Sequence, residues 1–229
     1  MKATQWYLLG YDELVSVIPP GATLAVRSRI APESRGKVPG VRYMSGHWGG
    51  YAWQDVECTL SDAARMDADG ANVGLRAARF PGVDIDVLDA ELAAVVGDYV
   101  ERTTGAKHYR VGLPPKRLYP FRLSGSPFPR RRLEIRRGDA RHLVEVLGAG
   151  QQYVIDGTHP SGQVYEWPAG VPLVTELPTV SAADVEQLLE GLAEYLSLLG
   201  WETDISSPSA PRVEVAGAGQ LDGLQVHLG

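Results

Sequence analysis

Two carboxylates, Asp84 and Asp86, lie two residues apart in the otherwise aliphatic run at 82–88, Gly-Val-Asp-Ile-Asp-Val-Leu. Side chains alternate between the faces of a strand, so both carboxylates should point to one face. Like charges this close raise each other's pKa and are costly to bury unless a cation lies between them. Asp-x-Asp also occurs by chance in surface turns, but the apolar strand around it favours a site for a hard divalent cation such as Mg²⁺ or Mn²⁺.

A third carboxylate, Glu145, interrupts a second apolar strand between Val144 and Val146. If the two strands are neighbours, Glu145 completes an acidic pocket for one or two metal ions. Two-metal centres need several oxygens around a shared phosphate. The alternative is that Glu145 is an ordinary outward-facing residue of the sheet.

Basic residues in two segments could bind phosphate. In 109–119 a strand leads into a Gly/Pro turn, with Arg110 before the turn and Lys116 after it, and this pattern suits a triphosphate. Arg76 lies on the strand before the acidic pair. It could reach a nucleotide, or it could form a structural ion pair with one of the two aspartates.

The turn at 156–162, Asp-Gly-Thr-His-Pro-Ser-Gly, offers hydrogen-bond donors. Thr158 and His159 could donate to a phosphate or to a base. Taken alone, His159 is also typical of a histidine in a surface turn.

Charge is distributed unevenly along the chain. The 229 residues carry a net charge of −6, yet residues 106–142 contain eleven Lys and Arg residues and only two acids, a net charge of +9. Such a segment favours a local anionic partner such as phosphate or nucleic acid. A solvated basic hairpin is the alternative.

The composition is that of a soluble globular protein, with 44% hydrophobic and 22% charged residues. No apolar run approaches the roughly 20 residues of a membrane span, and the N-terminus lacks the profile of a signal peptide. Cys58 is the only cysteine, which excludes an internal disulfide and a cysteine-based metal site. These features predict a cytoplasmic protein with no membrane partner.

The hydrophobic periodicity predicts an α+β fold with a mainly antiparallel sheet and helices packed on it, rather than a βαβ array. One helix should follow Asp89 and end at Thr104-Gly105, and another should begin at the capping box Ser181-x-x-Asp184. A short helix is expected at 61–66. Strands are expected at 22–26, 40–43, 72–77, 82–88, 108–112, 118–123, 132–136, 143–147, 153–156, 163–167, 172–174 and 212–216, with a turn at 48–51.

Taken in order, these segments resemble the archaeo-eukaryotic primase superfamily, specifically the prim-pol domain of bifunctional DNA primase/polymerases in phage and plasmid replication proteins. The resemblance rests on Asp84-Ile85-Asp86, on Glu145, and on the run at 159–167, His-Pro-Ser-Gly-Gln-Val-Tyr-Glu-Trp, and it extends from about residue 36 to residue 167. The chain departs from the family at Pro114-Pro115-Lys116, where Ser-x-His is usual, and it has Glu145 where Asp is more usual.

The resemblance implies an archaeo-eukaryotic primase fold, with an RRM-like catalytic module, an N-terminal αβ module and flanking helices. The catalytic domain would span 1–205 as two closely packed lobes, and 206–229 would be a linker and tail. The implied activity is template-directed transfer of a nucleotide from a dNTP or NTP to a 3′-hydroxyl on single-stranded or primed DNA. The protein would act in phage or plasmid replication in a bacterial host, with a replicative helicase, fused or separate, as a partner.

The resemblance also implies roles for the candidate residues. Two Mg²⁺ or Mn²⁺ ions would be held by Asp84, Asp86 and Glu145. The nucleotide would be bound by Lys116, Arg110, Arg76, His159 and Thr158. The template backbone would be contacted by Arg130, Arg131, Arg132, Arg136 and Arg137.

Two other functions are compatible with these residues. The missing Ser-x-His histidine is compatible with a degenerate primase-like domain that binds nucleic acid or nucleotide at a replication origin without polymerising. A nucleotide-sugar transferase can also carry Asp-x-Asp, but it would need a βαβ start that the Gly/Pro-broken first third of the chain does not offer.

Overall fold

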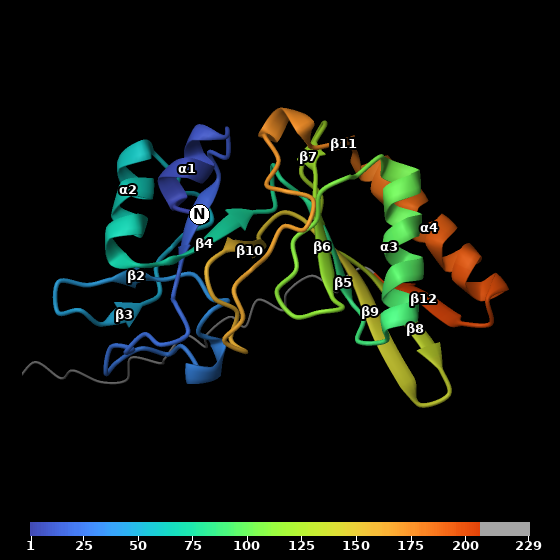
Figure 1. Cartoon of the computed structure of the whole chain (residues 1–229), viewed down its shortest axis with the longest axis horizontal. Coiled ribbons are helices and arrows are strands. Elements are labelled where there is room, and N and C mark those ends of the chain that lie inside the picture. Colours follow the sequence, from blue (N-terminus) through green and yellow to red (C-terminus); the bar gives the residue numbers. More distant parts are fainter. Residues whose placement is uncertain (207–229) are drawn as a thin grey trace, which may run out of the picture.

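The computed structural model describes residues 1–206, which form an α+β fold built on antiparallel sheets (Figure 1). The smaller sheet has the order β1-β4-β10 and the larger has the order β12-β8-β9-β5-β6. The strands of the smaller sheet are β1 (Leu14–Val17), β4 (Asn72–Arg76) and β10 (Gln152–Asp156). Those of the larger are β5 (Gly82–Asp86), β6 (Arg117–Pro120), β8 (Arg131–Arg137), β9 (Ala140–Leu147) and β12 (Glu202–Ser206). Two short pairs join β2 (Val41–Arg42) to β3 (Trp48–Gly49) and β7 (Arg122–Leu123) to β11 (Thr179–Val180).

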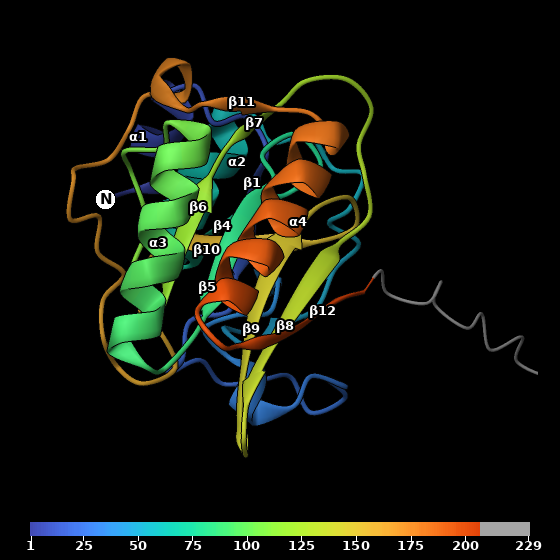
Figure 2. The same cartoon turned by 90° about the vertical axis from the view of Figure 1, so that its right-hand side faces the viewer.

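The helices cover one face of each sheet. The helices are α1 (Ala3–Leu8), α2 (Leu60–Asp69), α3 (Ala90–Thr104) and α4 (Ala182–Leu198), with 3₁₀ turns at Pro32–Ser34 and Val174–Glu176. α3 and α4 lie side by side on the larger sheet (Figure 2). They bury the aliphatic side chains of β5 with those of β8 and β9, so the polar residues of these strands face away from the helices. No helix among residues 1–206 is long and apolar enough to cross a membrane.

Both long helices begin where the sequence predicted. The Asp89 side chain accepts a hydrogen bond of 2.9 Å from the Leu92 amide, and Gly105 ends α3 with φ of 73°. In α4 the Ser181 hydroxyl and the Asp184 carboxylate form the expected capping box. Both predictions are confirmed. The sequence could indicate these caps because each one depends only on contacts within one turn of helix.

The two sheets are joined through their cores. Residues 77–81 carry the chain from β4 in one sheet to β5 in the other, so these consecutive strands are not partners. The Tyr153 hydroxyl of β10 donates to the Phe80 carbonyl at 3.0 Å. Leu118 and Leu147 lie on the face of the larger sheet opposite the helices, and both pack into the core of the smaller sheet. One end of that face is therefore covered by the smaller sheet.

Several expected elements differ in the structure. Residues 22–26 form only an isolated bridge at Leu24, and the expected turn at 48–51 contains β3. The segments 108–112 and 163–167 contribute isolated bridges rather than strands, and 118–123 is divided between β6 and β7. Residues 172–174, expected as a strand, form none, and Val174 begins a 3₁₀ turn. The sequence did not indicate α1, β1, β11 or β12. The strand expected at 212–216 lies outside the described residues.

Candidate nucleotide and metal site

The acidic residues meet on the helix-free face of the larger sheet. Asp84 on β5 is paired in register with Glu145 on β9, and on its other side with Leu118 on β6. Residues directly opposite in an antiparallel pair share a face. The condition stated from the sequence, that the strand of Glu145 neighbours the strand of the acidic pair, is therefore met.

Asp84 is partly buried, and its carboxyl has a raised pKa. Burial raises its pKa to about 6, while the nearby Arg110 opposes the rise and the carboxylates of Asp86 and Glu145 add to it. Within residues 1–206, no Lys, Arg or His side chain lies within ion-pair distance of Asp84. Asp84 is thus a poorly solvated acid that lacks a direct cationic partner.

The other two carboxylates already have partners. Lys116 forms an ion pair with Asp86, two residues along the same face. Glu145 is contacted by Arg132 at 2.8 Å and by Arg130 at 3.1 Å. In this arrangement, residues 1–206 contain no group of three or more His, Cys, Asp or Glu side chains able to hold a metal ion.

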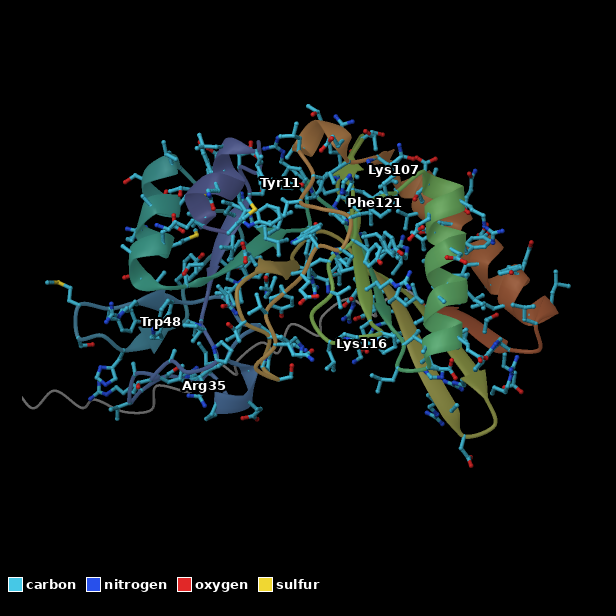
Figure 3. All side chains as sticks on the ribbon, in the orientation of Figure 1. Tyr11, Arg35, Trp48, Lys107, Lys116 and Phe121 are labelled. Atoms are coloured by element: carbon cyan, nitrogen blue, oxygen red, sulfur yellow. The ribbon has the colours of Figure 1, made fainter. Side chains whose placement is uncertain are left out.

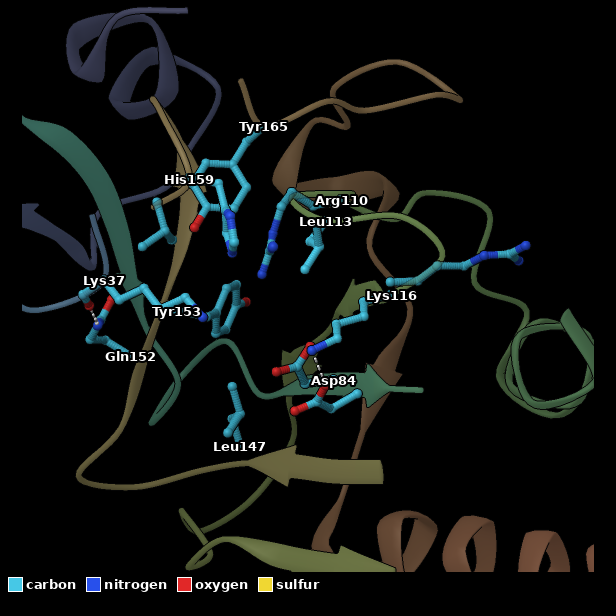
Figure 4. Close-up of a pocket in the computed structure, with 13 residues that line it drawn as sticks. Lys37, Asp84, Arg110, Leu113, Lys116, Leu147, Gln152, Tyr153, His159 and Tyr165 are labelled. Atoms are coloured by element: carbon cyan, nitrogen blue, oxygen red, sulfur yellow. Dashed lines mark hydrogen bonds and ion pairs between the residues drawn. The ribbon is translucent and has the colours of Figure 1, made fainter. Parts of the chain in front are cut away.

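A pocket of about 260 Å³ opens beside Asp84 and Asp86 where the two sheets meet (Figure 4). Three further candidates from the sequence, Arg110, Lys116 and His159, line it as well. Arg117, which follows Lys116 after the same Gly/Pro turn, also lines the pocket. The structure adds lining residues that the sequence had not indicated, and these include Lys37, Gln152, Tyr153 and Tyr165. Four Lys and Arg side chains and two aspartates thus surround one cavity, an arrangement that suits an anionic ligand and a cation together.

Arg110 is held in place by its backbone and presents its side chain to the pocket. Its amide and carbonyl bond to Leu118 of β6 at 2.8 and 2.9 Å. Its guanidinium lies over the Tyr165 ring, 4.7 Å from the centroid. The Nε atom is buried and has no hydrogen-bond partner among the described residues. A partly buried guanidinium with an unpaired Nε–H is suited to an incoming anionic group.

His159 projects toward the same pocket from the turn after β10 (Figure 4). The Ser161 amide donates to His159 Nδ1 at 3.1 Å, so the ring proton is assigned to Nε2. Burial lowers the pKa of His159, and the nearby cations Lys37, Arg110 and Lys116 lower it further. At neutral pH His159 is therefore an uncharged hydrogen-bond donor rather than an additional cation.

Lys37 is brought to the pocket by contacts that span long stretches of sequence. Its carbonyl accepts a 2.7 Å hydrogen bond from the Gln152 side chain on β10. The buried Asn72 donates to the Gly36 carbonyl at 3.3 Å and to the Thr158 carbonyl at 2.7 Å, and it accepts from the Thr158 amide at 3.0 Å. One side chain of β4 thus ties together the loops that carry Lys37 and His159.

Two of the candidate nucleotide-binding residues lie outside the pocket lining. Arg76 is buried, forms an ion pair of 2.5 Å with Glu13, and donates to the Gln54 carbonyl at 2.6 Å. It is therefore engaged in a structural ion pair, although with a different acid from those the sequence suggested. Thr158 contributes its backbone to the Asn72 contacts.

The five candidate template arginines all have partners within the protein. In addition to the two on Glu145, Arg131 pairs with Glu186 at 2.5 Å and Arg136 pairs with Glu134. Arg137 donates to the Leu199 carbonyl and lies 3.9 Å above the Trp201 ring centroid. Much of the positive charge of β8 is thus compensated by the fold itself.

Comparison with family models gave no match for the chain, and comparison with curated proteins gave no significant match.

The fit of a divalent cation differs among the three carboxylates. Asp84 and Asp86 supply the oxygen donors that Mg²⁺ and Mn²⁺ prefer, and Asp84 has no cationic partner to displace. The Asp86 carboxylate becomes available to a divalent cation only after Lys116 moves away from it. Glu145 does not line the pocket and is held by two guanidinium groups, so it serves as an anchor for arginines in this arrangement.

Proposed function

We propose that this chain is a template-directed nucleotidyltransferase of the primase/polymerase type, which transfers a nucleotide from a dNTP or NTP to a 3′-hydroxyl. The observation that carries the proposal is the single pocket in which Asp84 and Asp86 face Lys37, Arg110 and Lys116. Phosphoryl transfer requires groups that bind metal next to groups that bind phosphate, with little other chemistry from the protein.

The proposed fold is that of the archaeo-eukaryotic primases. The larger sheet with α3 and α4 on one face would be the RRM-like catalytic module, and the smaller sheet with α1 and α2 would be the N-terminal αβ module. The support is the antiparallel five-stranded order and the acidic residues on its helix-free face.

Each pocket residue has a task in this proposal. Arg110 offers its unpaired Nε to a phosphate oxygen, and Lys37 approaches the same space from the opposite lobe. Lys116 would leave Asp86 and move to the triphosphate when a nucleotide enters, because both are anionic partners within its reach. His159 would donate a neutral hydrogen bond through Nε2.

Asp84 and Asp86 would hold Mg²⁺ or Mn²⁺. When bound, such an ion lowers the pKa of the attacking hydroxyl and neutralises charge on the leaving pyrophosphate. The raised pKa of Asp84 supports this assignment, since a carboxylate ionised in a poorly solvated site gains most from a nearby cation.

A second candidate function is binding of nucleotide or nucleic acid without catalysis. The specific observation in its favour is Glu145, which is occupied by Arg130 and Arg132. A site with only two carboxylates available offers fewer oxygens than a two-metal centre requires.

Primer extension on a single-stranded template, with a labelled dNTP and either Mg²⁺ or Mn²⁺, tests the proposal. Asp84→Asn and Asp86→Asn should each lower incorporation by at least about 100-fold, as expected for groups that organise transition-state charge. Asp98→Asn makes the same change on an exposed position of α3 and should leave incorporation unchanged. Nucleotide or template binding without incorporation by the unsubstituted chain would favour the second function. Full activity of the double variant would refute the first.

A further inference from the structure

A second basic surface lies on the smaller-sheet side of the molecule, outside the arginine-rich segment. Residues 22–50 contain five Lys and Arg residues and a single acid, Glu33, so this stretch carries a net charge of +4 in a chain whose net charge is −6. We call this the loop surface and define its cations as Arg27, Arg29, Arg35, Lys37 and Arg42.

The loop surface is held together as one small unit. The Ala25 amide donates to the Trp48 carbonyl at 2.8 Å, and β3 pairs Trp48 with Arg42 of β2. Arg35 donates to the Ala22 carbonyl at 2.8 Å. Ile18, Ala22 and Trp48 form a separate buried cluster beneath these loops. The segment is thus a packed platform, and Figure 3 shows its Arg35 and Trp48 in the lower half of the view, which also contains Lys116.

The cations of the loop surface differ from those of β8 in their partners. Among residues 1–206, no Asp or Glu lies within ion-pair distance of any of the five. Arg27, Arg29 and Arg42 are also exposed. On β8 and just before it, four of the five candidate arginines are paired with a carboxylate. When exposed guanidinium groups without an acidic partner contact the phosphates of a nucleic acid, they displace the counterions condensed on it, which favours binding.

The loop surface continues into the candidate site, because Lys37 belongs to both. Next to Arg42, the turn of the β2–β3 hairpin exposes Tyr43 and Met44, at 45% and 108% of their reference areas. An exposed aromatic ring beside arginines is a typical platform for unstacked bases.

We propose that the loop surface binds the backbone of a single-stranded nucleic acid and leads it toward the pocket. The direction of the strand rests on the proposed function, whereas the binding itself needs neither metal nor catalysis. The charge of Arg27, Arg29 and Arg42 would supply most of the affinity, and Tyr43 would stack on a base.

Fluorescence anisotropy tests the inference on the full chain with a labelled oligothymidylate about 20 nucleotides long, longer than one site of this kind. EDTA is present so that the result does not depend on a metal. The triple variant Arg27→Ala/Arg29→Ala/Arg42→Ala should lose about 100-fold in affinity at about 0.1 M salt. Its slope of log affinity against log salt should be smaller by about 2, since each contact with a single strand contributes about 0.7.

A matched control removes the same charge elsewhere. Lys2→Ala/Arg102→Ala/Lys107→Ala replaces three cations that also lack an acidic partner among the described residues. Figure 3 shows Lys107 near the top of the view and Arg35 near the bottom. This control should bind the oligonucleotide within about threefold of the unsubstituted chain, because distant exposed charges are screened. Circular dichroism melting checks that both variants fold.

The outcomes separate this inference from the proposed function. Binding that is lost only in the loop-surface variant supports it, even if no nucleotide is ever incorporated. Equal losses in the two triple variants would mean a general charge effect and would overturn it. A greater loss in Arg136→Ala/Arg141→Ala would place the strand on the larger sheet and would overturn it as well, as would no binding by the unsubstituted chain.

Discussion

Asp84 and Asp86 differ in environment although they share one face of one strand. Asp86 is 46% exposed and paired with Lys116, whereas Asp84 is partly buried beside Glu145 and has no ion pair in the described structure. The fold therefore gives the Asp86 carboxylate a cationic partner and leaves the Asp84 carboxylate without one. Such a residue is costly for stability, and its presence is easier to explain if it serves a ligand.

Asp84→Asn should stabilise the protein in a pH-dependent way. The folded state holds the Asp84 proton up to a pKa of about 6, whereas an unfolded chain releases it near the ordinary value of 3.8. The contribution of Asp84 to the free energy of unfolding therefore falls as pH rises from about 4 to about 6, and then stays constant. Above pH 6 the variant should be more stable by about 2 kcal/mol, with partial exposure limiting the effect.

Urea unfolding of both proteins at several pH values measures this difference. Asp98→Asn is again the control and should show no such pH dependence. A stability difference that is the same at pH 4 and pH 7 would mean that the Asp84 pKa is not raised in the folded state.

At the scale of elements, the sequence indicated those features that depend on near neighbours. The caps of α3 and α4 and the acidic face of β5 follow from spacings of two or three residues. β1 was missed because all four of its residues are buried, so it shows no alternation, and β12 was missed because it is a largely exposed edge strand. Lys37 could not be found from the sequence, since its position depends on Gln152, 115 residues away.

The Asn72 side chain connects the elements that form one wall of the pocket. It joins β4 to the Gly36 loop and to the Thr158 turn, 36 and 86 residues away. The turn passes so close that a Cβ at Gly157 would lie 2.1 Å from Asn72 Oδ1, and Gly157 has a φ of 113°. Only glycine adopts this conformation at such a close approach without strain.

Asn72→Ala should therefore lower the free energy of unfolding by about 2 to 3 kcal/mol, because it leaves buried backbone groups of both loops unpaired. It should also weaken nucleotide binding, since Lys37 and His159 lose their common support. Thr158→Val is the matched control: Thr158 contacts Asn72 through its backbone, so this variant should stay within about 0.5 kcal/mol. Urea unfolding and equilibrium nucleotide binding measure the two effects, and equal losses in both variants would contradict the assigned role of Asn72.

At the scale of the molecule, the pocket exists because two sheets meet. Lys37 and His159 come from loops beside the smaller sheet, while Asp84 and Lys116 come from the larger. A site built from both sides needs a fixed relation between them. An apolar contact fixes the two sheets relative to each other, because Leu118 and Leu147 of the larger sheet are buried in the core of the smaller sheet.

Leu118→Ala tests whether the two sheets unfold as one cooperative unit. Leu118 is fully buried, so the variant should lose about 3 kcal/mol through lost burial and the cavity left behind. Tryptophan fluorescence reports mainly on the smaller-sheet side, because four of the five tryptophans lie outside the larger sheet and its helices: Trp6, Trp48, Trp53 and Trp167. Far-UV circular dichroism reports mainly on the larger-sheet side, because the long helices α3 and α4 dominate it. Urea transitions followed by tryptophan fluorescence and by circular dichroism should coincide in both the unsubstituted chain and the variant, because the shared core couples the two sheets. Separate midpoints in the unsubstituted chain would mean that the sheets are independent units, and the pocket between them would then need a ligand to hold it in place.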